Sequence, residues 1–224
     1  MDKYYSRKLS AERLKLCYDI APPRVQQYLQ AEIDYVASKI NRGEAILELG
    51  CGYGRVIREL DCSKVFAVGI DTSVNSLKMA KKYLSGIQSV DLVAADAIST
   101  GFHDQKFDLV FCIQNGISAF KVDRRKLIKE ALRMTKPGGK ALFTSYSSSF
   151  WDERLKWFEI QAAHGLVGEI DYELTGNGII YCKDGFKATT IGIEDFQYLT
   201  SDIDALVGIK EVDNSSVFCE LTRF

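Results

Sequence analysis

The chain has 224 residues, of which 46% are hydrophobic and 26% charged, a composition typical of a single folded domain. Its formal net charge of −1 gives no general attraction to polyanions, so we expect no nucleic-acid partner. The sequence has no apolar run long enough for a membrane-spanning helix and no secretory signal. We therefore expect one domain over residues 1–224, no membrane association and a cytoplasmic location.

The cysteines give no sign of a metal or disulfide site. Six of them stand at positions 17, 51, 62, 112, 182 and 219, without a C-x-x-C pair, and the chain has two histidines. We expect reduced, buried thiols and no bound metal.

Two helices are predicted before the first strand. The first spans residues 10–18, with Ser10 as its N-cap. The second begins at Pro22 and Pro23 and continues with apolar residues three to four positions apart, until Gly43 ends it.

Strand and helix patterns then alternate. Apolar runs predict strands at 45–49, 64–70, 90–96, 107–113 and 140–146. Helices are expected near 54–60, from a cap at Thr72 or Ser73 to Leu84, and after a cap at Asp123. The string "KPGG" at 136–139 predicts a turn into the fifth strand. Strands this apolar, separated by helices, indicate a parallel α/β sheet covered on both faces.

The C-terminal third departs from this alternation. Residues 147–193 predict an amphipathic helix and three short strand-like runs, and 194–207 predict another helix. The last residues, 208–224, indicate two strands with a turn near Asn214 and Ser215. A connection this short cannot make a parallel crossover, so these two strands must be antiparallel.

The loop after the first strand, "ELGCGYG" at residues 48–54, places glycine at every second position. No phosphate-binding G-x-x-x-x-G-K-[ST] motif occurs in the chain. A dinucleotide-binding G-x-G-x-x-G motif would need its third glycine where Arg55 stands. A turn without a ligand is a further alternative, although three glycines would then lower backbone stability with no gain.

This loop resembles the first motif of the class I S-adenosylmethionine-dependent methyltransferases, E/D-x-G-x-G-x-G. The resemblance covers residues of about 35–146, and the C-terminal hairpin extends it. It implies a Rossmann-like seven-stranded sheet with an antiparallel C-terminal hairpin. It also implies S-adenosyl-L-methionine as cofactor and S-adenosyl-L-homocysteine as product.

The resemblance also implies a set of cofactor-binding residues at the strand ends. Asp71, at the end of the second strand, would accept hydrogen bonds from the ribose hydroxyls, and Asp96 would accept one from the adenine amino group. The full set is Glu48, Gly50, Cys51, Gly52, Tyr53, Gly54, Asp71, Thr72, Ser73, Asp96, Ala97 and Gln114.

The methyl acceptor is expected on the other side of the cofactor. In this family the residues after the fourth strand face the transferred methyl group, and here they include Gln114 and Asn115. The [DNS]-P-P-[YF] motif of amino-methylating nucleic-acid enzymes is absent. Residues 147–193 are rich in aromatic side chains and hold seven acidic against four basic residues, which favours a small organic acceptor in a closed pocket.

We therefore divide the domain into an N-terminal helical lid (1–43), a cofactor-binding core (44–146), a substrate cap (147–193) and a last helix with its hairpin (194–224). No general base is assigned, because a thiol or neutral amine needs none. The candidates for orienting the acceptor are Gln114, Asn115, Tyr5, Tyr18, Tyr146 and Trp151.

The expected function is transfer of a methyl group to nitrogen, oxygen or sulfur of a small molecule, by a monomer or homodimer. Three alternatives stay open. One is methylation of RNA or protein, and another is a noncatalytic cofactor-binding module. The third is arsenite methylation, since Cys17 and Cys182 fall in the two lid segments.

Overall fold

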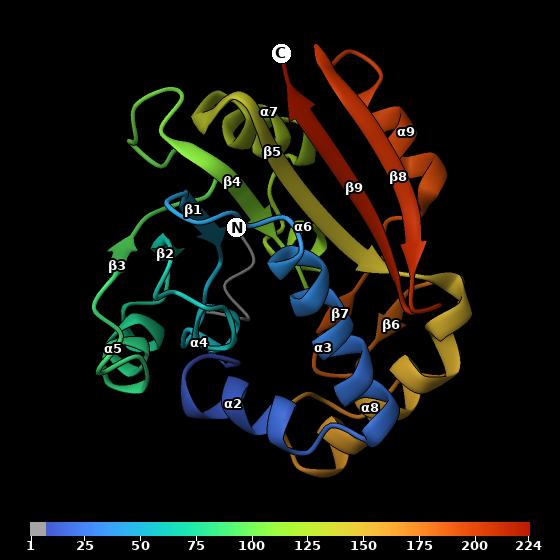
Figure 1. The fold of residues 1–224 in the computed structure, drawn as a ribbon. Helices are drawn as coiled ribbons and strands as arrows, with labels where there is room; N and C mark the ends of the chain where they lie inside the picture. Colours follow the sequence, from blue (N-terminus) through green and yellow to red (C-terminus); the bar gives the residue numbers. More distant parts are fainter. Residues whose placement is uncertain (1–7) are drawn as a thin grey trace.

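The central feature of the fold is a seven-stranded sheet with the order β3-β2-β1-β4-β5-β9-β8 and helices on both faces (Figure 1). The computed structural model describes residues 8–224. The elements in chain order are α2 (Glu12–Asp19), α3 (Pro23–Ala37), β1 (Ala45–Leu49), α4 (Arg55–Glu59), β2 (Phe66–Asp71), α5 (Val74–Tyr83), β3 (Val90–Ala94), β4 (Phe107–Cys112), α6 (Gly116–Ala119), α7 (Arg124–Met134), β5 (Thr135–Tyr146), the 3₁₀ turn η1 (Ser148–Phe150), α8 (Trp151–Ala163), β6 (Ile180–Tyr181), β7 (Lys187–Ala188), α9 (Ile193–Thr200), β8 (Ala205–Val212) and β9 (Ser216–Arg223).

The order of the strands places a crevice next to β1. Strands β1 to β5 pair in parallel, and the chain proceeds outward from β1 to β2 and β3 before it returns to β4 on the other side of β1. In open α/β sheets, ligands bind beyond the carboxyl ends of the strands where the order reverses in this way. The predicted glycine loop follows β1 at this edge.

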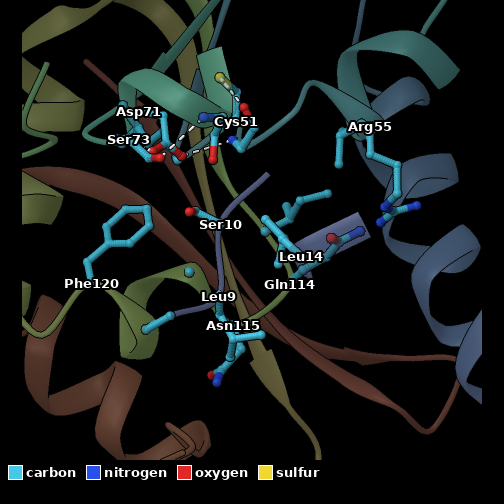
Figure 2. Close-up of a pocket in the computed structure, with 18 of the residues that line it drawn as sticks. Leu9, Ser10, Leu14, Cys51, Arg55, Asp71, Ser73, Gln114, Asn115 and Phe120 are labelled. Carbon is cyan, nitrogen blue, oxygen red and sulfur yellow. Dashed lines mark hydrogen bonds between the residues drawn. The ribbon is translucent and has the colours of Figure 1, made fainter. Parts of the chain in front are cut away.

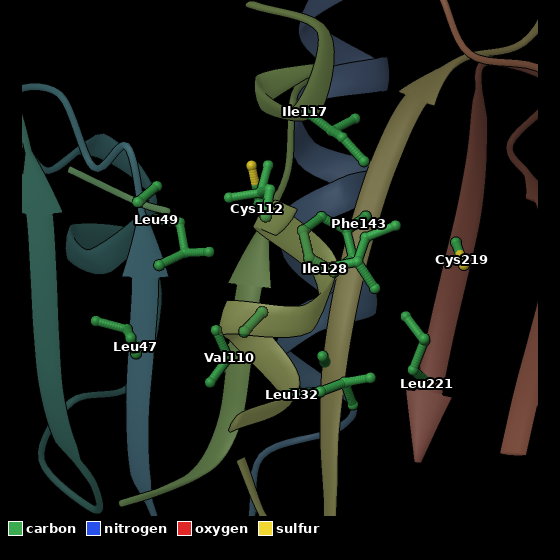
Figure 3. Packing of buried hydrophobic residues seen from close by; sticks show 14 of the residues in the cluster. Leu47, Leu49, Val110, Cys112, Ile117, Ile128, Leu132, Phe143, Cys219 and Leu221 are labelled. Atoms are coloured by element: carbon green, nitrogen blue, oxygen red, sulfur yellow. The ribbon is translucent and has the colours of Figure 1, made fainter. Parts of the chain in front are cut away.

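Two apolar layers hold the helices on the sheet. On one face, α7 and α9 pack against side chains of β1, β4, β5 and β9, and Figure 3 shows Ile128 and Leu132 of α7 among them. On the other face, α3, α4 and α5 cover a second cluster that includes Phe111 and Phe218. Burial of apolar surface on both faces explains why the parallel strands are apolar along their whole length.

Residues 147–193, hereafter the cap, lie together with the N-terminal segment at the carboxyl edge of the sheet (Figure 1). Their shared core contains Leu9 and Cys17 from the N-terminal segment and Phe158, Ile180 and Phe186 from the cap. The Trp157 indole also donates a hydrogen bond of 2.9 Å to the carbonyl of Cys17. The two segments predicted as lids therefore form one packed unit.

The predicted fold class is confirmed, including the antiparallel C-terminal hairpin, in which β9 pairs with β5 and β8. Ser73 and Asp123 also cap their helices, since their side chains accept from the backbone N–H of Ser76 and Lys126. These caps follow from the usual preference of short polar side chains for helix N-termini.

Several element boundaries were wrong. Helix α9 ends at Thr200, so residues 205–207 belong to β8 and not to the expected helix. Strand β5 already begins at Thr135, with a register irregularity through the expected "KPGG" turn. Helix α2 has Ala11 and not Ser10 at its N-cap. The three strand-like runs of the cap yield two strands of two residues each and isolated bridges.

Candidate functional site

A cavity of about 480 Å³ lies at the carboxyl ends of β1, β2 and β4 (Figure 2). Its walls come from the glycine loop, the starts of the segments after β2, β3 and β4, the N-terminal segment and the cap. Residues far apart in the sequence thus meet at the crevice that the strand order creates.

The glycine loop turns back on the sheet through left-handed backbone conformations. Gly50, Gly52 and Gly54 have φ values of 78°, 55° and 84°. The N–H groups of Gly50 and Cys51 both donate to the carbonyl of Ile70 on β2, at 2.8 Å. Only glycine adopts three such conformations without strain, so the spacing of the glycines is required by the backbone itself.

Two of these glycines also face close neighbours. A Cβ at Gly50 would stand 2.4 Å from Cζ of Phe120, and one at Gly52 would stand 3.1 Å from Cδ2 of Leu14. Phe120 follows α6, and Leu14 belongs to α2. The missing side chains therefore create the space into which elements from two sides of the cavity reach.

Asp71 connects the end of β2 to the glycine loop. Its Oδ2 accepts a hydrogen bond of 2.9 Å from the N–H of Gly52, and its Oδ1 accepts one of 2.7 Å from the N–H of Ser73. Burial raises the pKa of Asp71, whereas the bonds from Ser73 and Gly52 act in the opposite direction. Each carboxylate oxygen can accept more than one bond, so Asp71 keeps capacity toward the cavity.

Beyond β3 the cavity wall contains Asp96 and Ala97. One oxygen of Asp96 accepts from the N–H of Ile98 at 3.1 Å, which fixes a turn there. Ala97 is buried. This wall is a small apolar surface with one carboxylate at its edge.

The inner part of the cavity contains buried polar atoms without a hydrogen-bond partner among the described residues. They are Oε2 of Glu48, Nε and Nη2 of Arg55, Nε2 of Gln114 and Oη of Tyr28. Burial raises the pKa of Glu48 to about 8, with Arg55 lowering it and Asp71 raising it. Arg55 stacks over the Tyr18 ring at 4.6 Å. Buried donors and acceptors that have no partner among the described residues indicate a polar ligand.

Gln114 and Asn115, directly after β4, have φ values of 57° and 62°. Both line the cavity, but the Asn115 amide bonds elsewhere. Its Nδ2 donates to the carbonyl of Thr189 at 3.0 Å, and its Oδ1 accepts from Ser145 Oγ at 2.8 Å. Asn115 thus attaches the cap to β5. The side-chain Nε2 of Gln114, in contrast, has no hydrogen-bond partner among the described residues.

An aromatic wall closes the opposite side of the cavity. It consists of residues from the lid, from β5 and from the cap: Tyr18, Tyr28, Tyr146, Trp157, Phe158 and Phe186. Burial raises the pKa of Tyr18 to about 12, so its hydroxyl stays protonated and can donate a hydrogen bond at neutral pH.

The other candidate residues lie as follows. Trp151 and Gly54 are not among the residues of the cavity wall. The Trp151 ring faces the guanidinium of Arg154, and Gly54 faces the side chain of Leu84. Tyr5 lies outside the described residues.

Sequence reasoning missed several residues that line the cavity. These are Leu9, Ser10, Leu14, Ser76, Arg55 and Phe120. Only Arg55 could have been found from the sequence. It directly follows the glycine loop, and the first residue of a helix after such a loop lies close to the loop.

Cys17 and Cys182, the two cysteines behind the arsenite alternative, belong to the same apolar cluster, and Cys17 also lines the cavity. Both are buried in the core shared by the lid and the cap, and burial raises their pKa values to about 12 and about 11. Within residues 8–224, no group of three His, Cys, Asp or Glu side chains is arranged to hold a metal ion. No helix in this range is long and apolar enough to cross a membrane.

Residues 46–139 match a family model described as a methyltransferase domain. The chain is 36% identical over 106 residues to a demethylmenaquinone methyltransferase of Clavibacter sepedonicus, covering 47% of this chain and 42% of that protein. It is 24% identical over 148 residues to a ubiquinone biosynthesis O-methyltransferase of Coxiella burnetii, covering 62% and 56%. The matches thus span about half the length of these curated relatives.

Solved structures share the whole fold. The PH0226 protein of Pyrococcus horikoshii is similar with a TM-score of 0.70 and 20% identity, over 100% of both chains. A SAM-dependent methyltransferase from Methanosarcina mazei is similar with a TM-score of 0.62 and 19% identity, over 85% of this chain and 97% of that one. At this level of identity the similarity establishes the arrangement of the elements.

Proposed function

The chain belongs to the class I S-adenosylmethionine-dependent methyltransferases, and from this premise we propose that it methylates a small organic molecule in the aromatic-walled cavity. The observation that carries the proposal is the continuity of this cavity, which joins the glycine loop and Asp71 to Tyr146 and Trp157. A cofactor held at one end would face an acceptor held at the other.

The residues at the first end fit S-adenosyl-L-methionine. The carboxylate of Asp71 suits a pair of ribose hydroxyls, and the wall of Asp96 and Ala97 suits an adenine with its amino group. The unpartnered atoms of Glu48 and Arg55 supply an acceptor and donors, which suit the ammonium and carboxylate of the cofactor's amino-acid head. When bound, this cofactor would supply an electrophilic methyl group on its sulfonium sulfur, for in-line transfer to a nucleophile with S-adenosyl-L-homocysteine as the leaving thioether.

The cap and lid residues serve to orient the acceptor and to exclude water. Tyr18, Tyr146 and Trp157 provide flat surfaces of the kind that enclose small organic ligands; Tyr146 and Trp157 are buried and Tyr18 is partly buried. Orientation of two reactants in a closed site contributes roughly 7–11 kcal/mol to catalysis of such a reaction. The names of the two relatives refer to demethylmenaquinone and to ubiquinone biosynthesis, so hydroxylated aromatic molecules are the first acceptors to test.

The experiment is a transfer assay with methyl-labelled S-adenosyl-L-methionine and the purified protein. The acceptor panel contains hydroquinones and phenols, primary and secondary amines, and thiols. We expect label in one class of small molecule, together with S-adenosyl-L-homocysteine in equal amount. The Asp71→Ala variant serves as the control for contaminating activity.

Other outcomes point to the alternative functions. Cofactor binding without transfer to any acceptor, including those in a cell extract, would indicate a noncatalytic module. Label in RNA or protein and not in small molecules would indicate a macromolecular substrate. Absence of cofactor binding would contradict the proposal altogether.

A further inference from the structure

A buried carboxylate outside the cavity holds the backbone at the cavity's centre. Glu32 on α3 has no exposed surface, and its Oε2 accepts a hydrogen bond of 2.6 Å from the backbone N–H of Gln114. The hydroxyl of Thr144 on β5 donates to the same oxygen at 2.9 Å, and that of Ser216 on β9 donates to Oε1 at 2.6 Å. One carboxylate thus joins α3 to two strands and to the loop after β4.

The loop after β4 needs such support because its backbone is strained. Gln114 and Asn115 both have positive φ, a conformation that raises the energy of a residue other than glycine by about 1–2 kcal/mol. Strained residues of this kind persist where the surroundings fix them, and they cluster at functional sites. The amide bonds of Asn115 fix the second residue, and Glu32 fixes the first.

The consequence of this conformation is the placement of the Gln114 side chain. Gln114 lines the cavity, its Nε2 is buried, and no hydrogen-bond partner for that atom exists among the described residues. In Figure 2, Gln114 lies at the centre of the cavity, between the glycine loop and Asn115. A buried amide donor without a partner is unfavourable by about 1–3 kcal/mol, and a ligand that accepts its hydrogen bond removes this penalty.

We propose that Glu32 is a positioning residue, which holds Gln114 in the conformation that directs its side-chain amide at the ligand in the cavity. This inference rests on the proposed function, because the ligand is the cofactor together with its acceptor. Burial raises the pKa of Glu32 to about 7, whereas the hydrogen bonds from Ser216, Gln114 and Thr144 act in the opposite direction. An apolar residue would serve helix packing better at this position.

The test is a double-mutant cycle on binding of S-adenosyl-L-methionine, measured by calorimetry. Glu32→Leu removes the acceptor for the Gln114 N–H, and Gln114→Ala removes the side-chain amide. We expect each single variant to weaken binding about tenfold, and the double variant to bind within about twofold of Gln114→Ala alone. Such non-additivity means that Glu32 acts through Gln114.

Two further variants separate positioning from general stability. In Glu32→Gln the side-chain carbonyl can still accept from the Gln114 N–H and the Thr144 hydroxyl, while the amide group donates to the Ser216 hydroxyl, which can also accept. Binding should therefore return to within about threefold of wild type. Ser216→Ala removes a donor to the other oxygen of Glu32 and should lower the melting temperature with less than a twofold effect on binding.

An amide spectrum of the protein without ligand supplies a second readout. The Gln114 N–H, bonded to a carboxylate in the wild type, should lie strongly downfield and move upfield in Glu32→Leu. Additive effects in the cycle, or an unchanged Gln114 signal, would overturn the inference. A wild-type protein that binds no cofactor but shows the Gln114 signal would instead contradict the proposed function.

Discussion

The indole of Trp157, in the cap, donates a hydrogen bond to the carbonyl of Cys17, 140 residues earlier in the chain. Arg13 reinforces this connection with a bond of 2.6 Å to the carbonyl of Gly165. The side of the cavity opposite the glycine loop is therefore closed by two segments that depend on each other. These bonds hold the two segments together at the cavity.

Trp157→Phe should loosen this closure, because phenylalanine retains an aromatic ring but leaves the buried carbonyl of Cys17 without its donor. We expect the free energy of unfolding to fall by about 1–2 kcal/mol and protease cleavage within residues 8–20 to become faster. Limited proteolysis and thermal denaturation check both effects. A variant cleaved at the wild-type rate would show that the bond does not close the cavity.

Asp71→Ala should weaken binding of S-adenosyl-L-methionine by about 1.5–3 kcal/mol, the range for a charge-assisted hydrogen bond. The matched control is Asp123→Ala, which also removes a carboxylate that accepts from backbone N–H, but at the start of α7. The control should lose about 1 kcal/mol of stability and bind the cofactor normally. Calorimetry on both proteins measures the difference, and equal affinities would contradict the assigned role of Asp71.

Gly52→Val should abolish detectable cofactor binding in a folded protein, because a branched side chain at φ 55° would be strained and would fill the space beside Leu14. Gly208→Val is the control, since β8 leaves open space around that glycine. Replacement of Leu14 by alanine in the Gly52→Val protein should relieve the close contact without restoring affinity. Binding by Gly52→Val at wild-type strength would mean that residues 48–54 are only a turn.

The pH dependence of stability should be set by two buried glutamates. Burial raises the pKa values of Glu32 and Glu48 to about 7 and about 8, from 4.5. A raised carboxyl pKa means that the folded state binds protons more tightly, so the associated stability is present below pH 4.5 and is lost as the pH rises through 7 and 8. Each pKa unit corresponds to about 1.4 kcal/mol.

We therefore expect the melting temperature of the ligand-free protein to fall between pH 5.5 and 8.5. Arg55 is the charged group that lowers the pKa of both glutamates, and Asp71 raises the pKa of Glu48. Glu48→Gln should reduce the fall in melting temperature at the high-pH end of this range. Glu59→Gln, at an exposed position, should leave the pH dependence unchanged. A melting temperature that rises over this interval would show that other groups dominate.

The regular part of this fold could be predicted because its signals are local. Apolar strands, caps at Ser73 and Asp123, and a short final turn each determine structure through neighbouring residues. The errors have equally specific causes. No helix was predicted at α6, because its four residues form little more than one turn and show no repeating pattern. Residues 201–207 continue an apolar pattern that suits either a helix or β8.

The site was only partly accessible to sequence reasoning. Asp71 and the glycine loop stand at strand ends, where the pattern shows them. Glu32 lies within an amphipathic helix, where its sequence position suits a solvent-exposed acid. Only the fold shows that β5 and β9 supply hydroxyl donors to it, from more than 100 residues away. Arg154 looks like a surface residue of an amphipathic helix, yet it is almost completely buried.

Arg154 allows the role of the cap in methyl transfer to be tested separately from the role of the core in cofactor binding. Arg154 donates to the carbonyls of Gly178 and Ala188, both at 3.0 Å, and its guanidinium lies 4.6 Å from the centre of the Tyr146 ring. It therefore binds the cap together and packs it on the end of β5. Every residue that we assign to the cofactor, in contrast, lies at or before position 114.

Arg154→Met should loosen the cap and leave the cofactor end intact, because methionine fills much of the volume but cannot donate to the two carbonyls. We expect faster hydrogen exchange within residues 176–190 and affinity for S-adenosyl-L-methionine within about tenfold of wild type, or roughly 1.4 kcal/mol. Methyl transfer should fall by a larger factor, since orientation and exclusion of water depend on the cap. Arg154→Lys keeps a single donating group, so its rate of methyl transfer should lie between those of the wild type and Arg154→Met. Equal losses of affinity and transfer would mean that the cap supports the whole domain and does not select the acceptor.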